Sequence, residues 1–426
     1  MKHKVLILGT LGEFTELVKK AKEKGYETVV CDGYADGIAR TYADKAYTIP
    51  VTDVDAIALM CREEGVDGII TSFSDLLLEC MVKIADKAGL PCYLKPEQLS
   101  WYRDKSACRD VLDKLGLPAP GFRKISVELL KQGSEEEIQQ SIANLQYPLI
   151  SKPLDKYGSR GIFIIKDQEQ LAGSVRKTAE FTDLDEILIE EYNDGFEFNM
   201  MTWVSDGAVR VISIADREKT QFAEGELPES TRNVYPSCLI DKVEEPAVSL
   251  LQSYIEYTGQ KEGPLSMQFF WKAGEGIQVC EIAARFFGYE HELTDMVYRF
   301  NMEELLLNYV YDNEYVTKML EAQDIRKPLM HGAVLYFHGR LKQIQEQQAA
   351  YELAEDKAVV KPWIFYEAGE EVVAYGPNPY LALYYIEAGS REELDEISRD
   401  FFEKMSMTDP DGEEIVFQNK IPKYSL

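Results

Sequence analysis

Short apolar runs alternate with stretches of helical spacing over residues 1–100. The runs "KVLILG" and "YETVVCD" have the character of buried strands, and "EFTELVKKAKEKG" repeats apolar positions at helical spacing before it ends at Gly25. The alternation continues through the helix "DAIALMCREEG", the strand "VDGIITSF" and the helix "DLLLECMVKIADKAG". A repeated strand–helix unit predicts a parallel, doubly wound sheet, so the predicted fold class is α/β.

Proline signals divide the rest of the chain. A helical stretch, "DKSACRDVLDKLG", precedes "LPAPGF", where Pro118 and Pro120 end the helix and mark a boundary. A helix is expected to begin in "GSEEEIQQ", and strands are expected at "GAVLYFHG" and "VVAYG". The predicted units are a Rossmann-like sheet at 1–100, a helical linker at 101–120, a small unit at 121–192, long strands followed by helices at 193–330, and an α+β segment at 331–426.

Composition narrows the class of protein. Apolar content of 45% and charged content of 28% are typical of a globular protein, and no run approaches the ~18 apolar residues of a membrane helix. The first apolar run, Val5 to Leu8, is shorter than a signal-peptide core, so we expect a cytoplasmic protein without membrane partners. Seven cysteines without a CxxC pair and only four histidines favour reduced thiols and disfavour a zinc site.

The net charge of −28 sharpens the interpretation of any basic cluster. Such a surface repels phosphate backbones, so nucleic acid is not an expected partner. An anionic small molecule would have to be met by a local basic pocket. Basic residues grouped in one loop are therefore more informative here than in a basic protein.

One such loop lies in "YPLISKPLDKYGSRGIFIIK", between two apolar strands. Lys152 stands at the end of the first strand, and glycines allow backbone N–H groups to approach a charged ligand closely. The segment does not match GxxxxGK[ST], so it is not a Walker A loop. A basic hairpin with turn glycines is the alternative. The candidate ligand groups are Lys152, Lys156, Gly158, Ser159, Arg160 and Gly161.

A second cluster, "ILIEEYNDGFEF", places acidic residues at the end of an apolar strand. Glu190, Glu191 and Tyr192 end the strand, where backbone groups without a strand partner could face an adenine edge. Glu197 follows Gly195 and could accept both ribose hydroxyls. An acidic surface turn is the alternative interpretation.

A third cluster, "GPLSMQFFWKAGEGIQVCEIAARFFGYEH", has the pattern of two strands joined by the turn "KAGEG". Gln268 and Glu281 would then face each other across the pair. Side-chain oxygens on adjacent strands suit Mg²⁺, which takes few protein ligands, and Arg285 could hold a transferring phosphoryl group. An amphipathic hairpin with a surface ion pair is the alternative.

The order of these clusters resembles the ATP-grasp superfamily of carboxylate–amine ligases. "SMQFFWKAGEGIQVCEIAAR" is similar to the paired metal-ligand strands of carbamoyl-phosphate synthase large chains and related amino-acid ligases. "ADKAYTIPVTDVDAI" and "DKSACRDVLDKLGLPAPGF" look like the pre-ATP-grasp segment and the link into the lid. The resemblance implies a pre-ATP-grasp domain at 1–100, a lid at 121–192, a central catalytic domain at 193–330, and a C-terminal segment packed on the central domain.

The resemblance also implies roles for individual residues. Lys105 and Lys152 would contact the phosphates of ATP, and the loop from Gly158 to Gly161 would close over them. Glu190, Glu191 and Tyr192 would line the adenine pocket, Glu197 would take the ribose, and Gln268 with Glu281 would hold Mg²⁺ or Mn²⁺. The implied catalytic residues are Arg285, Lys152 and Arg160. Two departures stand out: Ala283 replaces the usual asparagine metal ligand, and Pro153 follows the lysine of a loop with few glycines.

The expected function is that of an ATP-dependent ligase, which joins a small carboxylate to an amine through an acyl phosphate. An amino acid is the leading expectation for one substrate, and a homodimer is a further expectation from the resemblance. A carboxylase or carbamate-forming enzyme is the alternative within the class, while one set of motifs is too few for a two-step carbamoyl-phosphate synthase. The substrate candidates are Ser74, Asp75, Arg217, Arg232, Glu290 and His291.

Two other classes stay open from the sequence. Gly9, Gly12 and Asp32 would support an NAD-dependent oxidoreductase on the first sheet, although G-x-G-x-x-G is incomplete. Ala283 would support a nucleotide-binding module without catalysis. Absence of nicotinamide binding would exclude the first, and substrate-dependent ATP turnover would exclude the second.

Overall fold

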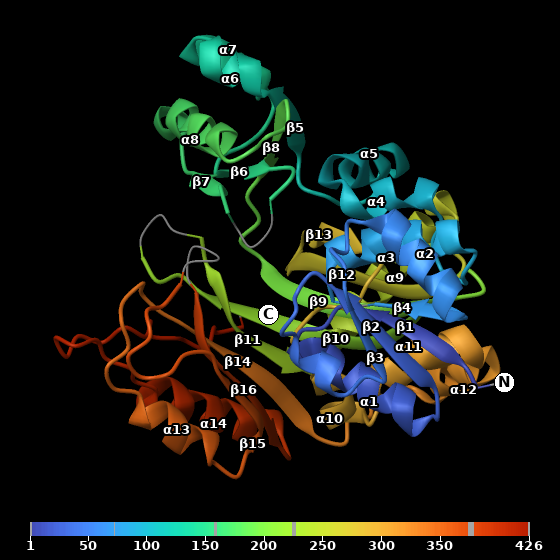
Figure 1. Ribbon diagram of the computed structural model, residues 1–426. Helices are drawn as coiled ribbons and strands as arrows, with labels where there is room; N and C mark the ends of the chain where they lie inside the picture. Colours follow the sequence, from blue (N-terminus) through green and yellow to red (C-terminus); the bar gives the residue numbers. More distant parts are fainter. Residues whose placement is uncertain (1, 72, 157–159, 224–226, 374–378, 425–426) are drawn as a thin grey trace.

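The computed structural model describes residues 2–71, 73–156, 160–223, 227–373 and 379–424 (Figure 1). Gly158 and Ser159, two of the loop residues predicted to bind phosphate, lie outside the described residues. The chain forms three sheets, one of four parallel strands, one of four antiparallel strands and one of eight strands. The α/β class and the parallel first sheet are confirmed.

The N-terminal sheet has the strand order β3-β2-β1-β4. Asp53 and Ser74 accept hydrogen bonds from the first turns of α2 and α3, and Gly65 and Gly89 end these helices in the left-handed conformation. The sequence pattern did not predict β3, because its side chains are mostly exposed. The elements are β1 (Lys4–Leu8), η1 (Gly12–Phe14), α1 (Thr15–Glu23), β2 (Glu27–Asp32), η2 (Ile38–Thr41), β3 (Lys45–Thr48), α2 (Val54–Glu64), β4 (Gly68–Ile70) and α3 (Asp75–Ala88).

A helical linker follows, and then a small unit of four strands, β5 to β8, which we call the lid. Asp104 caps α5 through the backbone N–H groups of Ser106 and Ala107, and Gly116 ends the helix. The lid sheet is antiparallel, with the order β5-β8-β6-β7 and its own apolar core. The elements are η3 (Pro96–Gln98), α4 (Leu99–Arg103), α5 (Lys105–Leu115), β5 (Phe122–Ser126), α6 (Val127–Gln132), α7 (Glu135–Ser141), β6 (Leu149–Pro153), β7 (Phe163–Ile165), α8 (Gln168–Glu180) and β8 (Glu186–Glu191).

The eight-stranded sheet runs in the order β13-β12-β9-β10-β11-β14-β16-β15. Strands of residues 331–426 are therefore hydrogen-bonded into the same sheet as those of 193–330, through the β11–β14 pair. Its elements are β9 (Phe196–Ser205), β10 (Ala208–Thr220), β11 (Glu229–Tyr235), α9 (Ile240–Thr258), β12 (Gly263–Lys272), β13 (Gly276–Ala283), α10 (His291–Tyr298), α11 (Met302–Tyr311), α12 (Asn313–Ala322), β14 (His331–His338), α13 (Gln348–Ala354), β15 (Val359–Ile364), β16 (Tyr380–Ala388) and α14 (Arg391–Lys404).

The strand predicted at "VVAYG" is wrong for its first two residues. Val372 and Val373 lie outside any strand, and the side chain of Val373 is 63% exposed, while residues 374–376 fall outside the described part of the chain. Two adjacent valines raise local strand propensity, but in the described part of the chain the pairing here is limited to the isolated Gln343–Glu371 bridge and the Val372 N–H bond to the Lys342 carbonyl.

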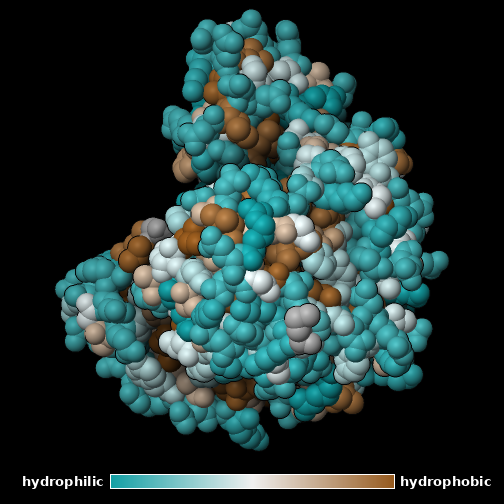
Figure 2. All heavy atoms as spheres, turned by 45° about the vertical axis from the view of Figure 1, so that its right-hand side comes forward, coloured by the Kyte–Doolittle hydropathy of each residue, from teal (hydrophilic) through white to brown (hydrophobic). Residues whose placement is uncertain are grey.

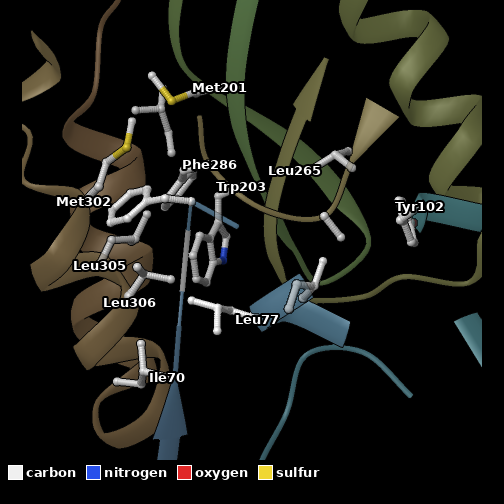
Figure 3. Close-up of a cluster of buried hydrophobic side chains, with 14 of the residues drawn as sticks. Ile70, Leu77, Tyr102, Met201, Trp203, Leu265, Phe286, Met302, Leu305 and Leu306 are labelled. Atoms are coloured by element: carbon white, nitrogen blue, oxygen red, sulfur yellow. The ribbon is translucent and has the colours of Figure 1, made fainter. Parts of the chain in front are cut away.

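One apolar core joins the N-terminal sheet to the large sheet. Figure 3 shows Leu77 of the N-terminal unit beside Trp203 of β9, and Ile70 of the same unit below Leu306, which with Leu305 comes from α11; Phe286 belongs to the same cluster. These side chains are 8% exposed or less. Because the two sheets share this core, their ends are held in a fixed relation. Within the described residues, no helix is long and apolar enough to cross a membrane.

Candidate active site

A cavity of about 1100 Å³ lies between the lid and the large sheet, with α4 and α5 along one side. The space-filling view shows the lid projecting from a mostly hydrophilic body, with a recess beneath it (Figure 2). The cavity brings together residues from all three sequence clusters and from the N-terminal unit. The predicted site residues that line it are Asp75, Lys105, Lys152, Lys156, Glu190, Glu191, Tyr192, Glu197, Arg217, Gln268, Glu281 and Arg285.

Lys152 and Glu190 form an ion pair on neighbouring lid strands. β6 and β8 are antiparallel, and Lys152 Nζ lies 2.5 Å from Glu190 Oε2. Burial alone would raise the pKa of Glu190, but the charges of Arg109 and Lys152 outweigh it and lower the pKa to about 2. Burial likewise opposes the charged form of Lys152, and Glu190 raises the pKa of this lysine overall. Both groups are therefore ionised at neutral pH.

Lys105 and Lys156 approach each other at the lid entrance. The Lys105 ammonium donates to the Lys156 carbonyl oxygen at 3.0 Å, which joins α5 to the end of the loop after β6. Lys156 Nζ lies 2.7 Å from Asp155 and 3.0 Å from Asp183, and these hydrogen bonds raise the pKa of Lys156. Two cations of the predicted phosphate site thus face one region of the cavity.

Glu191 and Tyr192 are held by the strands that enter and leave the lid. The backbone N–H of Glu191 donates to the Gly121 carbonyl, and that of Tyr192 donates to the Pro148 carbonyl, both at 2.9 Å. The Glu191 carboxylate accepts from the Gln146 backbone N–H at 2.9 Å. The Tyr192 ring is partly exposed at the cavity, where it offers a flat surface beside these backbone groups.

Glu197 is surrounded by donors rather than by solvent. Arg217 Nη1 lies 2.6 Å from Glu197 Oε1, Lys219 forms an ion pair with Oε2, and the Gln268 amide also donates to Oε1. Burial would raise the pKa of Glu197, but Arg217 and Lys219 outweigh it and lower the pKa to about 2. The carboxylate is thus ionised and fixed at the cavity floor, with Arg217 and Lys219 beside it.

Gln268 and Glu281 are direct cross-strand partners in the β12–β13 pair, as the sequence pattern predicts. Because Gln268 uses its amide nitrogen on Glu197, its side-chain oxygen is left for another partner. Throughout the described ranges, no hydrogen bond or ion pair engages the Glu281 carboxylate. An available amide oxygen beside an available carboxylate suits a hard cation that takes few protein ligands.

The candidate metal site offers few protein ligands. Among the residues that the structure describes, no group of three or more His, Cys, Asp or Glu could hold a metal ion. Ala283, opposite Ser266 in the β12–β13 register, places a buried methyl group where the resemblance implies an asparagine ligand. Gln268 and Glu281 therefore fit a Mg²⁺ ion whose remaining ligands are phosphate oxygens and water.

Arg285 links the end of β13 to the N-terminal unit. Its Nε and Nη2 lie 2.6 and 2.9 Å from the two oxygens of Asp75, the first residue of α3. Burial opposes ionisation of Asp75, but this fork and the charges of Arg285 and Arg103 lower the pKa of the carboxyl group. Arg285 is thus oriented by an acid from another domain at the cavity wall.

Several predicted residues do not line the cavity. Ser74 caps α3, and Gly161 adopts φ +74° with its Cα against Phe181 and Pro153, where a side chain would collide. Arg160 is exposed next to the undescribed loop residues. The structure does not bring these three to the cavity wall.

Arg232, Glu290 and His291 lie in the interior, where each contacts other protein side chains. Arg232 is fully buried, with its Nε 2.7 Å from Glu218 and Nη1 2.7 Å from Asp395. Glu290 accepts from Tyr235 and Asn199, and burial raises its pKa to about 7. Because these charges already have protein partners away from the cavity, the structure does not place them as substrate contacts.

The first sheet does not present a dinucleotide site. The Asp32 carboxylate is 6% exposed and accepts from the Thr10 and Gly33 backbone N–H groups at 3.0 and 2.7 Å. The Phe14 ring fills the space beside Gly9, and Trp363 packs beside Gly12. The tight-turn interpretation of these glycines accounts for them, and the acid has no free edge for a ribose.

Sequence reasoning did not single out two basic cavity residues, Arg103 and Arg109. Arg109 follows Cys108 and is one of the buried residues of α5. A charged residue next to the apolar positions of a helix is the only sequence signal that could have identified it. Lys219, a basic candidate in "IADREKT" together with Arg217, also lines the cavity, because the period of two places both residues on one face of β10. Arg103 ends α4 without a distinguishing pattern.

Comparison with known proteins defines the class. Residues 145–292, about a third of the chain, match the ATP-grasp domain family. The match spans the lid strands β6, β7 and β8, the acidic cluster and the β12–β13 pair, while β5 precedes it. The resemblance recognised in the sequence is therefore confirmed.

Particular relatives share this domain. A carbamoyl phosphate synthase large chain from Clostridium perfringens is 25% identical over 274 residues, which are 63% of this chain and 24% of that protein. The chain thus spans about a quarter of the length of that relative. The L-amino acid ligase of Bacillus licheniformis has a similar fold, with a TM-score of 0.78, 18% identity, and coverage of 96% of this chain and 99% of that chain.

A third similar fold comes from a structure with bound ligands. It is the biotin carboxylase domain dimer of 2-oxoglutarate carboxylase from Hydrogenobacter thermophilus, in complex with MgADP, ADP and bicarbonate. Its TM-score is 0.70 at 15% identity, and the likeness covers 97% of this chain and 92% of that chain. At this identity the likeness concerns the fold.

Proposed function

We propose that this chain is an ATP-dependent carboxylate–amine ligase that releases ADP and phosphate. In this reaction a carboxylate takes the γ-phosphoryl group of ATP, and an amine displaces phosphate from the acyl phosphate to form an amide. The observation that carries the proposal is the meeting, in one cavity, of Lys105, Lys152 and Lys156 with the Gln268–Glu281 pair and Arg285. A likeness in fold to an amino-acid ligase supports an amino acid as one substrate.

The proposed roles follow from charge and position. Lys105, Lys152 and Lys156 neutralise phosphate oxygens, and phosphoryl transfer depends chiefly on such positioning and charge compensation. Glu191 and Tyr192 border the adenine at the strand crossing into the lid. The guanidinium of Arg285, oriented by Asp75, stabilises the negative charge that develops on the transferred phosphoryl group.

Two predicted roles change their meaning in this arrangement. Glu190 sits behind Lys152, and its two carboxylate oxygens are engaged by Arg109 and Lys152, so an adenine contact in this region would use backbone groups instead. Glu197 already accepts from Arg217, Lys219 and Gln268, so a ribose would have to replace one of these donors. We propose Arg217 and Lys219 as additional contacts for the anionic ligand.

Gln268 and Glu281 would hold Mg²⁺ or Mn²⁺. Such an ion, when bound, shields the negative charge of the phosphates and aligns them for transfer. The chain's own contribution is to keep the amide oxygen of Gln268 and the carboxylate of Glu281 side by side on rigid strands. We further propose a cytoplasmic enzyme and a homodimer, as expected from the resemblance.

The decisive experiment measures Mg²⁺-dependent ADP release from ATP over pairs of amino acids and small carboxylates. Substrate-dependent release that is lost in Lys152→Ala and Glu281→Ala would establish the ligase and name its substrates. Bicarbonate is included as a carboxylate, because the carbamate-forming alternative predicts release with bicarbonate alone. ATP binding without turnover for any pair would favour the non-catalytic module, and absence of ATP binding would refute the proposal.

A further inference from the structure

Arg109 occupies the junction of three parts of the chain. It lies on α5, is 3% exposed, and pairs through Nε with Glu190 Oε1 of the lid strand β8. Its Nη2 donates to the Cys280 carbonyl oxygen at 2.8 Å, and Cys280 directly precedes Glu281 on β13. The Arg109 guanidinium on α5 therefore contacts both the lid strand β8 and the strand β13 of the large sheet.

The same carboxylate serves Arg109 and Lys152. Arg109 uses Oε1 of Glu190, and Lys152 Nζ lies 2.5 Å from Oε2. Glu190 is 1% exposed, so solvent does not screen these charges. Two cations around one buried carboxylate leave one positive charge in excess, and only Lys152 of the two cations extends from the lid over the cavity.

The excess charge depends on Arg109. Without the guanidinium, Lys152 and Glu190 would form a neutral pair, and a phosphate would meet a lysine whose charge is already spent on a carboxylate at hydrogen-bond distance. With Arg109 in place, its guanidinium compensates the negative charge of the Glu190 carboxylate. The Lys152 ammonium then keeps its attraction for an anion.

We propose that Arg109 is a positioning residue for polyphosphate binding, which neutralises Glu190 and thereby frees the charge of Lys152 for the ligand. Although Arg109 lines the cavity, its guanidinium is engaged by Glu190 and by the Cys280 carbonyl, so it acts through Lys152. The proposal rests on the proposed function only for the identity of the nucleotide, because a free polyphosphate should sense the same charge. Its contact with the Cys280 carbonyl also fixes the lid strand relative to the strand that carries Glu281.

The test uses the full-length protein, with inorganic triphosphate and MgATP as probes in titration calorimetry. Arg109→Met should weaken triphosphate binding at least about tenfold, since a full charge is lost next to the ligand. Arg109→Lys, which keeps the charge, should stay within about threefold of the wild type. Arg176→Met is the matched control, because Arg176 caps the Leu130 and Gly133 carbonyls inside the lid and does not line the cavity.

A second variant separates charge compensation from a merely structural role. In Arg109→Met/Glu190→Gln the carboxylate is gone, so Lys152 again carries an uncompensated charge and triphosphate binding should return to within about threefold of the wild type. A structural role predicts that a second buried substitution makes binding worse. If Arg109→Met does not fold, Arg109→Lys and the double variant are compared with the wild type.

Three results would overturn the inference: wild-type affinity in Arg109→Met, no recovery in the double variant, or failure of the wild type to bind triphosphate. The proposed function fails separately. A wild type that binds triphosphate and shows the expected variant pattern, but releases no ADP with any substrate pair, would keep the inference about Arg109 and remove the ligase.

Discussion

His291 is a buried imidazole between two acids. Its Nδ1 lies 2.5 Å from Glu303 and its Nε2 3.1 Å from Glu292, while its ring stacks on Phe73 of the N-terminal unit at 4.3 Å. Burial alone would lower the pKa of His291, but Glu292 and Glu303 outweigh it and raise the pKa to about 9 from the ordinary 6.5. Lys361, Glu13 and the two acids complete the charged surroundings.

This environment predicts a loss of stability at alkaline pH. A raised pKa in the folded state means that the stabilisation is complete below pH 6.5 and disappears as the pH rises through 9. The free energy of unfolding should fall by about 2–3 kcal/mol over that window. Urea unfolding from pH 7 to about 9 should show this slope in the wild type and a flat profile in His291→Gln.

His331→Gln is the control for the histidine test. His331 is partly buried and its pKa is lowered by burial, so its substitution should leave the alkaline slope unchanged. Glu290, whose pKa is raised to about 7, titrates at the lower edge of this range and is present in the wild type and in both variants. An undiminished slope in His291→Gln would contradict the assignment.

Sequence reasoning at the residue scale succeeded where local spacing fixes geometry. Gln268 and Glu281 could be matched because a hairpin with a short turn determines which residues face each other. Arg109 could not be matched to Glu190, since the helix and the strand meet only after the lid has folded back. The engagement of Glu197 by Arg217 and Lys219 likewise depends on the neighbouring strand β10.

At the element scale, β10 carries different charges on its two faces. Arg217 and Lys219 face the cavity, whereas Asp216 and Glu218 are buried on the opposite face. Arg391 of α14 lies 2.8 Å from each of these acids. Helix α14 is therefore bound to the acidic face of β10, the strand that presents Arg217 and Lys219 to the cavity.

Loss of Arg391 should destabilise the protein markedly. Arg391→Met leaves Asp216 and Glu218 with fewer buried charge partners, and we expect the free energy of unfolding to fall by about 3 kcal/mol. Arg399→Met on the exposed face of the same helix should change it by less than about 0.5 kcal/mol. Urea unfolding at neutral pH measures both, and equal effects would show that the pairs with β10 contribute nothing.

Elements with a clear period were predictable, and those defined by pairing were not. Most strands and helices of the first sheet follow from apolar spacing, and the helix expected to begin in "GSEEEIQQ" is present and is capped by Ser134. The exposed β3 carries little periodic signal, and Val372 and Val373 have the composition of a strand but lie beside isolated pairing only. Pairing partners, rather than propensity, decided these cases.

At the scale of the whole molecule, the lid and the large sheet differ in their independence. The lid has a core of its own, formed by residues such as Leu130, Ile165 and Val175. The large sheet instead combines strands from 193–330 and 331–426, joined where β11 pairs with β14. The boundary at 330 expected from the sequence therefore cuts through one sheet, while the boundaries of the lid fall between cores.

Two truncations test this difference. A fragment of residues 118–194 should fold alone, with a cooperative thermal transition, since it retains its sheet and core. A chain of residues 1–330 should not fold, because the β11 edge and the apolar side chains that β14 covers would be exposed. Circular dichroism and size-exclusion chromatography distinguish the outcomes, and a monomeric, cooperatively melting 1–330 chain would contradict the expectation.

The β11–β14 pair also has a consequence for synthesis on the ribosome. β11 ends at Tyr235, and its partner begins only at His331, with α9 to α12 and the β12–β13 hairpin translated in between. Throughout that interval the β11 edge of the nascent chain has no β14 to pair with. Nascent chains with such an edge bind chaperones and aggregate when these are scarce. Slow translation between the two strands would therefore lower the yield of folded protein, and the part of the message that encodes residues 236–330 sets how long the edge stays open.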